Sequence, residues 1–266
     1  MKNNTLKISH ELPLSLLKYG YKWNDYDYLL PIFADKYPEY RMYFINAKRD
    51  GRFIIMDNSL FEGYVHTTED LLSKIHIYRP NIFIVPDAWN DSTTTLINAK
   101  QWMNIHKPNI VEGCELMAVC QGKNLDELTL TYNNLLSLGY KHIAINHSSI
   151  AYQDMYPDLS LLNAQMYGRI KFIRHLLQTG ILDKTVYHHL LGSSNWIEFQ
   201  SYTEYKWIKS CDTSAPIING ALGNKFNHTG IYIKPKEKLE DIIEIDLSDK
   251  LDIIKYNVGF FRKSLS

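Results

Sequence analysis

The chain has 266 residues, of which 45% are hydrophobic and 22% are charged, as in an ordinary globular protein. Its 29 basic residues balance 29 acidic ones, so the net charge of zero argues against a surface coated in positive charge for holding nucleic acid. The longest apolar runs are far too short to cross a bilayer, and residues 1–10 lack the apolar core of a signal peptide. We therefore expect a cytoplasmic protein with no membrane partner.

The three cysteines, Cys114, Cys120 and Cys211, have no framework spacing and include no CxxC pair. An odd number of cysteines without such spacing is typical of a reducing compartment, so we expect no disulfides. Closely spaced zinc ligands and glycine-rich cofactor motifs are also missing. The sequence therefore predicts no metal and no cofactor.

Near-continuous apolar runs predict β-strands that are covered on both faces. Most of these runs are ~20–40 residues apart, which is the length of one strand-plus-helix unit. The predicted strands are residues 53–57, 82–87, 116–121, 142–146, 186–191, 207–212 and 230–234.

The segments between the strands carry helix signals, with polar residues at the start and, in two cases, glycine at the end. The predicted helices begin near residue 67 and extend over about 124–138, 159–178 and 194–205.

This alternation of strands and helices predicts an α/β fold with a parallel sheet. A barrel is favoured over an open sheet because seven or eight units fit the length and no glycine-rich dinucleotide turn follows an early strand. We predict a TIM-type (β/α)8 barrel that spans residues 1–266 as a single domain without a zinc subdomain. The tail over 236–266 would close the barrel or pack a last helix beneath it.

Several predicted strands end in polar residues, and in a parallel barrel all strands end on the same face. Asp212 ends the strand over 207–212. A carboxylate there could attack an anomeric carbon and form a glycosyl ester, or it could be an ordinary turn or N-cap aspartate.

Asp57 and Asp87 end two earlier strands. They could share acid/base work or hold a donor-rich ring, and the alternative is that both are turn residues. The amide of Gln121 offers a donor and an acceptor, and Gly122 would let a planar ligand approach the backbone. A simple strand-to-helix turn would also explain this pair.

Three further features have weaker functional interpretations. Asn146 ends a strand on the same face and could line the pocket or form a turn. Gly192 opens a Gly-Ser-Ser-Asn segment that could cradle an anion but lacks the lysine of a P-loop. His188 and His189 share one strand, so one ring should face the core and the other the helices. A metal role would need further ligands at that point.

Four of these segments, in this order, resemble motifs of the tRNA-guanine transglycosylases. Residues 55–61 (IMDNSLF) are similar to the aspartate-serine-glycine-glycine-phenylalanine motif, and 117–122 (MAVCQG) to the glutamine–glycine motif. Residues 189–192 (HLLG) resemble the strand and glycine before the nucleophile, and 209–216 (KSCDTSAP) resemble the nucleophile segment. The resemblance covers roughly 53–223, about two-thirds of the chain.

The family is a TIM barrel that exchanges guanine in a nucleic acid for a 7-deazaguanine through a covalent intermediate. By position, the resemblance implies that Asp212 is the nucleophile and Asp57 the acid/base partner. Stacking on the base would come from Phe61, Tyr64 or Trp89. The residues that the resemblance implies for the base pocket are Ser59, Asp87, Gln121, Gly122, Asn146 and Gly192.

The sequence also departs from the family pattern. The zinc site and the long basic C-terminal extension have no counterpart, and Ser59 and Leu60 replace the double glycine of the aspartate motif. These differences favour the compact phage and bacterial relatives that act on DNA. We therefore expect DNA rather than tRNA as the polymer, with a base such as 7-cyano-7-deazaguanine.

Alternatives stay open at this point. One is tRNA as the substrate, and another is a hydrolase that releases a base to water. A third is an inactive barrel that only binds a base or a protein. The resemblance also allows a homodimer.

Overall fold

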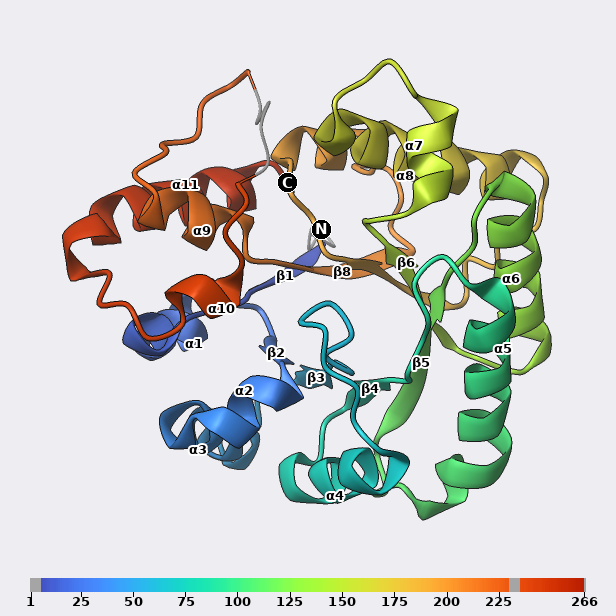
Figure 1. The fold of residues 1–266 in the computed structure, drawn as a ribbon, viewed down its shortest axis with the longest axis horizontal. Coiled ribbons are helices and arrows are strands. Elements are labelled where there is room, and N and C mark those ends of the chain that lie inside the picture. Colours follow the sequence, from blue (N-terminus) through green and yellow to red (C-terminus); the bar gives the residue numbers. More distant parts are fainter. Residues whose placement is uncertain (1–5, 230–234, 266) are drawn as a thin grey trace.

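The computed structural model describes residues 6–229 and 235–265. In this part of the chain eight parallel strands form one sheet in the order β1-β8-β7-β6-β5-β4-β3-β2, and helices surround it (Figure 1). This arrangement confirms the predicted α/β barrel. The strands are β1 (Lys7–His10), β2 (Asp27–Leu29), β3 (Ile54–Met56), β4 (Ile82–Ile84), β5 (Glu115–Cys120), β6 (His142–Asn146), β7 (Tyr187–Leu191) and β8 (Ile208–Thr213).

The barrel is nearly closed, with a seam between β1 and β2. Across this seam the hydroxyl of Ser9 accepts a hydrogen bond from the Tyr28 N–H at 3.1 Å. The N–H of Asp25 donates to the Ile8 carbonyl at 2.8 Å. In the described residues the barrel is thus completed by two N-terminal strands that sequence analysis missed. The tail does not close it but packs a last helix, Leu251–Lys263, against the helix Ala215–Ala221, which is the other expected arrangement. The strand predicted over 230–234 lies outside the described residues.

The helices alternate with the strands and cover the outer face of the barrel. They are α1 (Gly20–Trp23), α2 (Pro31–Lys36), α3 (Pro38–Arg49), α4 (Thr68–Tyr78), α5 (Ser92–Gln101), α6 (Leu125–Ser137), α7 (Ile150–Met155), α8 (Leu161–Gln178), α9 (Ala215–Ala221), α10 (Leu239–Ile242) and α11 (Leu251–Lys263).

Two predicted helix starts are confirmed by their caps. The side chain of Thr67 accepts from the Asp70 N–H, and that of Asn124 accepts from the Glu127 N–H. These bonds satisfy N–H groups that have no partner inside the helix.

The two later predicted helices differ from expectation. The helix expected from residue 159 begins two residues later, because Ser160 is the N-cap, and a separate α7 precedes it. The helix expected over 194–205 is only a short 3₁₀ helix, Trp196–Ser201, which Asn195 caps. After this helix the chain makes a turn, in which the Tyr205 N–H donates to the Tyr202 carbonyl at 2.8 Å, and leads into β8.

The core consists largely of strand residues, since both faces of the sheet are covered. All three residues of β3, Ile54, Ile55 and Met56, are completely buried. The three cysteines are buried free thiols.

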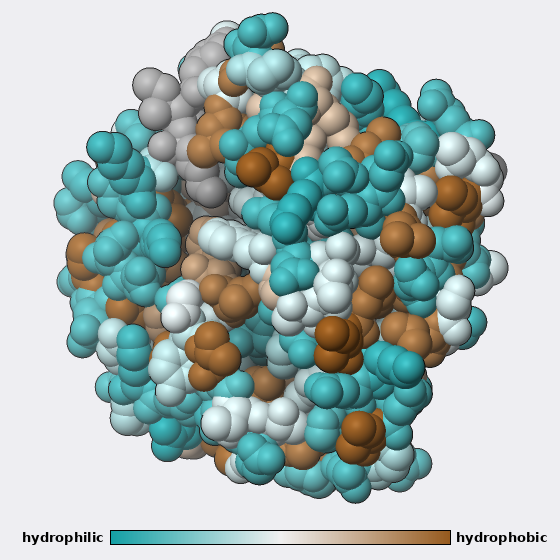
Figure 2. All heavy atoms as spheres, turned by 45° about the vertical axis from the view of Figure 1, so that its right-hand side comes forward, coloured by the Kyte–Doolittle hydropathy of each residue, from teal (hydrophilic) through white to brown (hydrophobic). Residues whose placement is uncertain are grey.

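Two observations on the described residues concern membranes and partners. None of the helices in the described ranges combines the length and the apolar character needed to cross a bilayer. On the face drawn in Figure 2, hydrophobic residues are scattered among hydrophilic ones. Scattered apolar residues are normal for a protein surface, so this face does not locate the expected homodimer contact.

Candidate active site

A cavity of about 260 Å³ opens at the C-terminal ends of the barrel strands. This is the end at which TIM barrels carry their active sites, because the loops after all the strands meet there. The predicted site residues that line it are Asp57, Asp87, Gln121, Asn146, Gly192 and Asp212.

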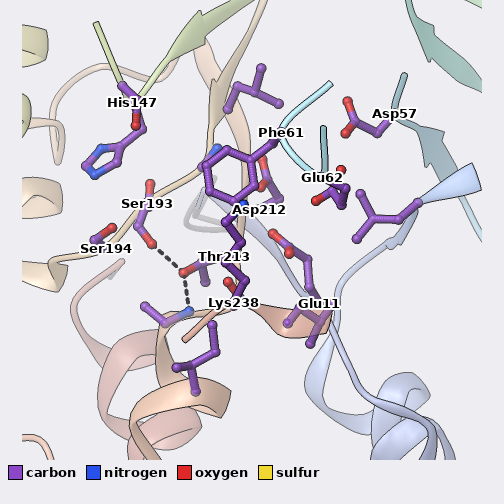
Figure 3. Close-up of a pocket in the computed structure, with 18 of the residues that line it drawn as sticks. Glu11, Asp57, Phe61, Glu62, His147, Ser193, Ser194, Asp212, Thr213 and Lys238 are labelled. Carbon is purple, nitrogen blue, oxygen red and sulfur yellow. Dashed lines mark hydrogen bonds between the residues drawn. The ribbon is translucent and has the colours of Figure 1, made fainter. Parts of the chain in front are cut away.

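Asp212 is held rigidly near the end of β8. Its Oδ1 atom accepts hydrogen bonds from the Gly192 N–H and from His189 Nε2, both at 2.9 Å. The strand continues one residue further than predicted. There the hydroxyl of Thr213 donates to the Ser193 carbonyl and accepts from the Ala215 N–H (Figure 3). The Thr213 bonds tie the loops after β7 and β8 together. The two N–H donors of Asp212 both bind Oδ1, so neither of them binds Oδ2.

Three other carboxyl groups, from Glu11, Asp57 and Glu62, lie around Asp212 (Figure 3). Burial raises the pKa of Glu11 well above its usual value, and the charge of Asp212 raises it further. Burial likewise raises the pKa of Asp57, and the charge of Glu62 adds to this shift. Burial also raises the pKa of Glu62 to about 7. Carboxyl groups this close cannot all ionise near neutral pH, so the cluster keeps protons next to Asp212.

Sequence analysis missed Glu11 and Glu62. Glu11 directly follows β1, whose sequence Lys-Ile-Ser-His contains no apolar run that would mark it as a strand. Glu62 lies in the loop after β3, five positions beyond Asp57. A polar residue after the short alternating segment over 6–10 was the one available signal for Glu11.

A row of hydrogen-bonded side chains crosses the ends of β4, β5 and β6. Asp87 accepts from Asn58 Nδ2 at 2.8 Å through Oδ1 and from Gln121 Nε2 at 2.6 Å through Oδ2. Gln121 Oε1 in turn accepts from Asn146 Nδ2 at 3.0 Å. Burial raises the pKa of Asp87, and the bonds from Gln121 and Asn58 lower it in part. This row holds the Asp87 carboxylate, which can accept hydrogen bonds, beside the Gln121 amide, which has a second N–H to donate.

Aromatic side chains stand at the rim of the cavity. The rings of Phe61 and Trp89 meet edge to face with centroids 5.9 Å apart, and both rings line the cavity. Lys238 Nζ lies 5.4 Å from the centroid of Phe61. These rings are available to stack on a planar ligand. The third predicted stacking residue, Tyr64, is not among the lining residues and packs against His66 instead.

Two predicted base-pocket residues do not line the cavity. Ser59 is completely buried, and its hydroxyl accepts from the Ile32 N–H at 3.3 Å, at the start of α2. At Gly122 a Cβ would lie 2.7 Å from the Leu128 nitrogen, so the close approach of α6 requires this glycine, not a ligand. Gly192 does line the cavity, but its N–H binds Asp212.

The two adjacent histidines face opposite sides of the sheet, as predicted. His188 Nε2 lies 2.8 Å from the hydroxyl of Tyr132, on the helix side. His189 lies inside the barrel, against Asp212 and Ser210. Because the rings point apart, they do not form a metal-binding pair.

Within the described residues, one group of side chains has metal-ligand spacing, and it lies outside the cavity. It consists of Asp35, His66 and Asp70. Lys74 Nζ lies 2.8 Å from Asp35 and 2.7 Å from Asp70. A lysine therefore already pairs with both carboxylates, and we assign no metal to this group.

We expect Glu62→Gln to flatten the pH dependence of thermal stability between about pH 4.5 and 7. A glutamate in the unfolded chain ionises near 4.5, whereas folded Glu62 keeps its proton to about pH 7. The folded state binds more protons in this window, so wild-type stability falls as the pH rises through it. Calorimetric melting temperatures at several pH values measure the slope, with Glu204→Gln, at an exposed position, as the control. Equal slopes for wild type and Glu62→Gln would contradict the assignment.

Comparison with known protein families finds no family model that matches this sequence, and no curated protein is significantly similar to it. The function must therefore be inferred from the geometry of the cavity.

Proposed function

We propose that this protein is a guanine transglycosylase, which exchanges guanine in DNA for a 7-deazaguanine through a covalent bond between Asp212 and the sugar. One observation carries the proposal. The Asp212 carboxylate, held by two N–H donors, lines the same cavity as Asp87 and Gln121. These last two side chains are joined by a hydrogen bond and present an acceptor next to a donor.

The edge formed by Asp87 and Gln121 complements guanine. The Watson–Crick edge of guanine presents ring and amino N–H donors next to a carbonyl oxygen. Asp87 can accept from the donors, and the remaining N–H of Gln121 can donate to the carbonyl. A 7-deazaguanine has the same edge, so one pocket can hold the leaving and the incoming base in turn. Phe61 and Trp89 provide faces for stacking.

The carboxyl groups suit a two-step displacement. Oδ2 of Asp212 attacks C1′ of the sugar, and the electron pair of the C1′–N9 bond leaves with guanine. Asp57, protonated in its buried position, gives its proton to a ring nitrogen of the leaving base. Asp57 then takes the N9 proton of the incoming deazaguanine, whose nitrogen attacks C1′ and releases Asp212 as a carboxylate.

The backbone at Ser59 also supports the resemblance to transglycosylases. This residue has φ +62°, in the left-handed region that favours glycine. Ser59 occupies the position at which the aspartate motif of that family has its first glycine. The backbone at Ser59 thus has a conformation that a glycine at this position would adopt readily.

DNA is proposed as the polymer because the three cysteines are dispersed, buried thiols and form no zinc site of the tRNA-modifying kind. A guanine in a duplex has to be flipped out of the stack, or presented in a single strand, to reach the cavity.

The test is to incubate the protein with 7-cyano-7-deazaguanine and either DNA or tRNA, digest the polymer and identify nucleosides by mass spectrometry. Incorporation into DNA supports the proposal, and incorporation into tRNA alone would show that tRNA, not DNA, is the substrate. Release of guanine without an incoming base would indicate a hydrolase. No exchange and no release with either polymer would overturn the proposal.

We expect Gln121→Leu to weaken binding of the free base by about 10- to 100-fold, measured by isothermal titration calorimetry. The reason is that a buried carbonyl of the ligand would lose its donor, which costs ~1–3 kcal/mol. Gln200→Leu, at an exposed position outside the cavity, is the control. Unchanged affinity in a folded Gln121→Leu variant would contradict the assigned role in base recognition.

A further inference from the structure

A chain of hydrogen bonds leads to Asp212 from the neighbouring strand. The hydroxyl of Tyr187 donates to Ser210 Oγ at 2.8 Å. Ser210 Oγ lies 2.8 Å from His189 Nδ1, and His189 Nε2 lies 2.9 Å from Asp212 Oδ1. Ser210 and His189 are completely buried, and Asp212 is 3% exposed. The chain is therefore shielded from water over most of its length.

The Asp212 end sets the direction of this chain, because a carboxylate only accepts and His189 Nε2 must therefore donate to it. In the neutral ring Nδ1 is then the acceptor, and the hydroxyl of Ser210, which accepts from Tyr187, donates to it. A ring that accepts at Nδ1 carries its proton on Nε2, where it faces the acceptor oxygen of Asp212. The ring of Tyr28 stacks on His189 with centroids 6.0 Å apart and restrains its rotation.

We propose that His189 is a positioning residue that fixes which oxygen of Asp212 reacts and keeps the covalent ester cleavable. This inference rests on the proposed role of Asp212 as the nucleophile. His189 Nε2–H and the Gly192 N–H both bind Oδ1, so the bond to the sugar forms at Oδ2.

The same two donors assist the second step. In the ester, Oδ1 is the carbonyl oxygen. When the incoming base attacks C1′, the electron pair of the C1′–Oδ2 bond returns to the carboxylate of Asp212. Donors already placed at Oδ1 stabilise this returning charge without rearrangement. Removing the His189 donor should therefore slow the breakdown of the ester as well as its formation.

Two substitutions of His189 distinguish the roles of its two ring nitrogens. The amide of His189→Gln reaches about as far as Nε2 and keeps a donor for Asp212, whereas that of His189→Asn reaches about as far as Nδ1. We expect base exchange in DNA to slow by ~10- to 100-fold in His189→Asn and by less than about threefold in His189→Gln. The KM for the incoming base should stay the same. In His189→Asn the covalent adduct, trapped by denaturation, should persist longer after the base is added. Equal rates in the two variants would overturn the proposal.

A second measurement does not depend on activity. Nitrogen-15 NMR of the histidine side chains should show His189 as the Nε2–H tautomer in the wild type, and Ser210→Ala should change its Nδ1 signal. An Nδ1–H tautomer in the wild type would overturn the inference whatever the activity. The expected tautomer in a protein that exchanges no base would instead overturn the proposed function, and with it the catalytic part of this inference.

Discussion

Replacing Asp212 with asparagine should reduce base exchange by at least ~10⁴-fold and abolish the covalent adduct with DNA. The asparagine carbonyl can still accept from Gly192 and His189, so the fold and the loops around the site should be preserved. What the variant loses is the second carboxylate oxygen, which is the proposed nucleophile. Denaturing electrophoresis of the protein with a labelled oligonucleotide measures the adduct, and mass spectrometry of the digested DNA measures the exchange.

The control for this experiment is Asp158→Asn, at an exposed position outside the cavity, which should leave both readouts unchanged. An adduct that survives in Asp212→Asn and maps by peptide mass spectrometry to Glu11 or Asp57 would transfer the role of nucleophile to that residue.

The largest effect on stability is expected at the ion pair between Arg169 of α8 and Glu198. Two bonds of 2.7 and 2.8 Å join the guanidinium to the carboxylate, and both side chains are fully buried. Arg169→Met would leave Glu198 buried without its charged partner. We expect the free energy of unfolding to fall by about 3–5 kcal/mol, which lowers the melting temperature by on the order of 10 °C.

Thermal unfolding of three variants tests this prediction. Arg174→Met, at an exposed position on the same helix, should change stability by no more than ~0.5 kcal/mol. The double variant Arg169→Met/Glu198→Leu should regain much of the loss, because it leaves no unpaired charge in the core. A loss below ~1 kcal/mol in Arg169→Met would show that the pair does not stabilise the fold in this way.

The same ion pair also supports the candidate site. Arg169 donates to the Gly192 carbonyl at 2.8 Å and to Ser193 Oγ at 3.0 Å. These bonds hold the loop whose N–H binds Asp212. Base exchange in Arg169→Met should therefore fall even at temperatures at which the variant is folded.

The central strands could be predicted from sequence because their residues are apolar on both faces. The strands β1 and β2 could not, since buried polar residues interrupt their apolar pattern. Asp27, for example, is paired with Arg52 at 2.7 Å, and His10 bonds to Asn24 at 2.9 Å. Such partners come from other parts of the chain, and no local pattern reveals them.

The residues of the candidate site could likewise be predicted from the sequence only in part. Asp57, Gln121 and Asp212 were found because polar residues at the ends of apolar strands meet on one face of a barrel. Proximity to a strand end does not tell which way a side chain points, and this is why Ser59 and Gly122 were wrongly placed in the cavity. His189 was not recognised as a partner of Asp212 because the contact depends on how β7 and β8 lie against each other.

The pairing of β1 with β8 also has a consequence for biosynthesis. Lys7 lies opposite Ser210 and Ser9 opposite Asp212, so β1 pairs with a strand that is synthesised much later. Contacts between such distant segments form late, because a long loop must close first. Glu11 and Asp212 would then meet only after β8 has emerged. A nascent chain should consequently carry no working site until its barrel closes, and that step should limit the rate at which newly made protein becomes active.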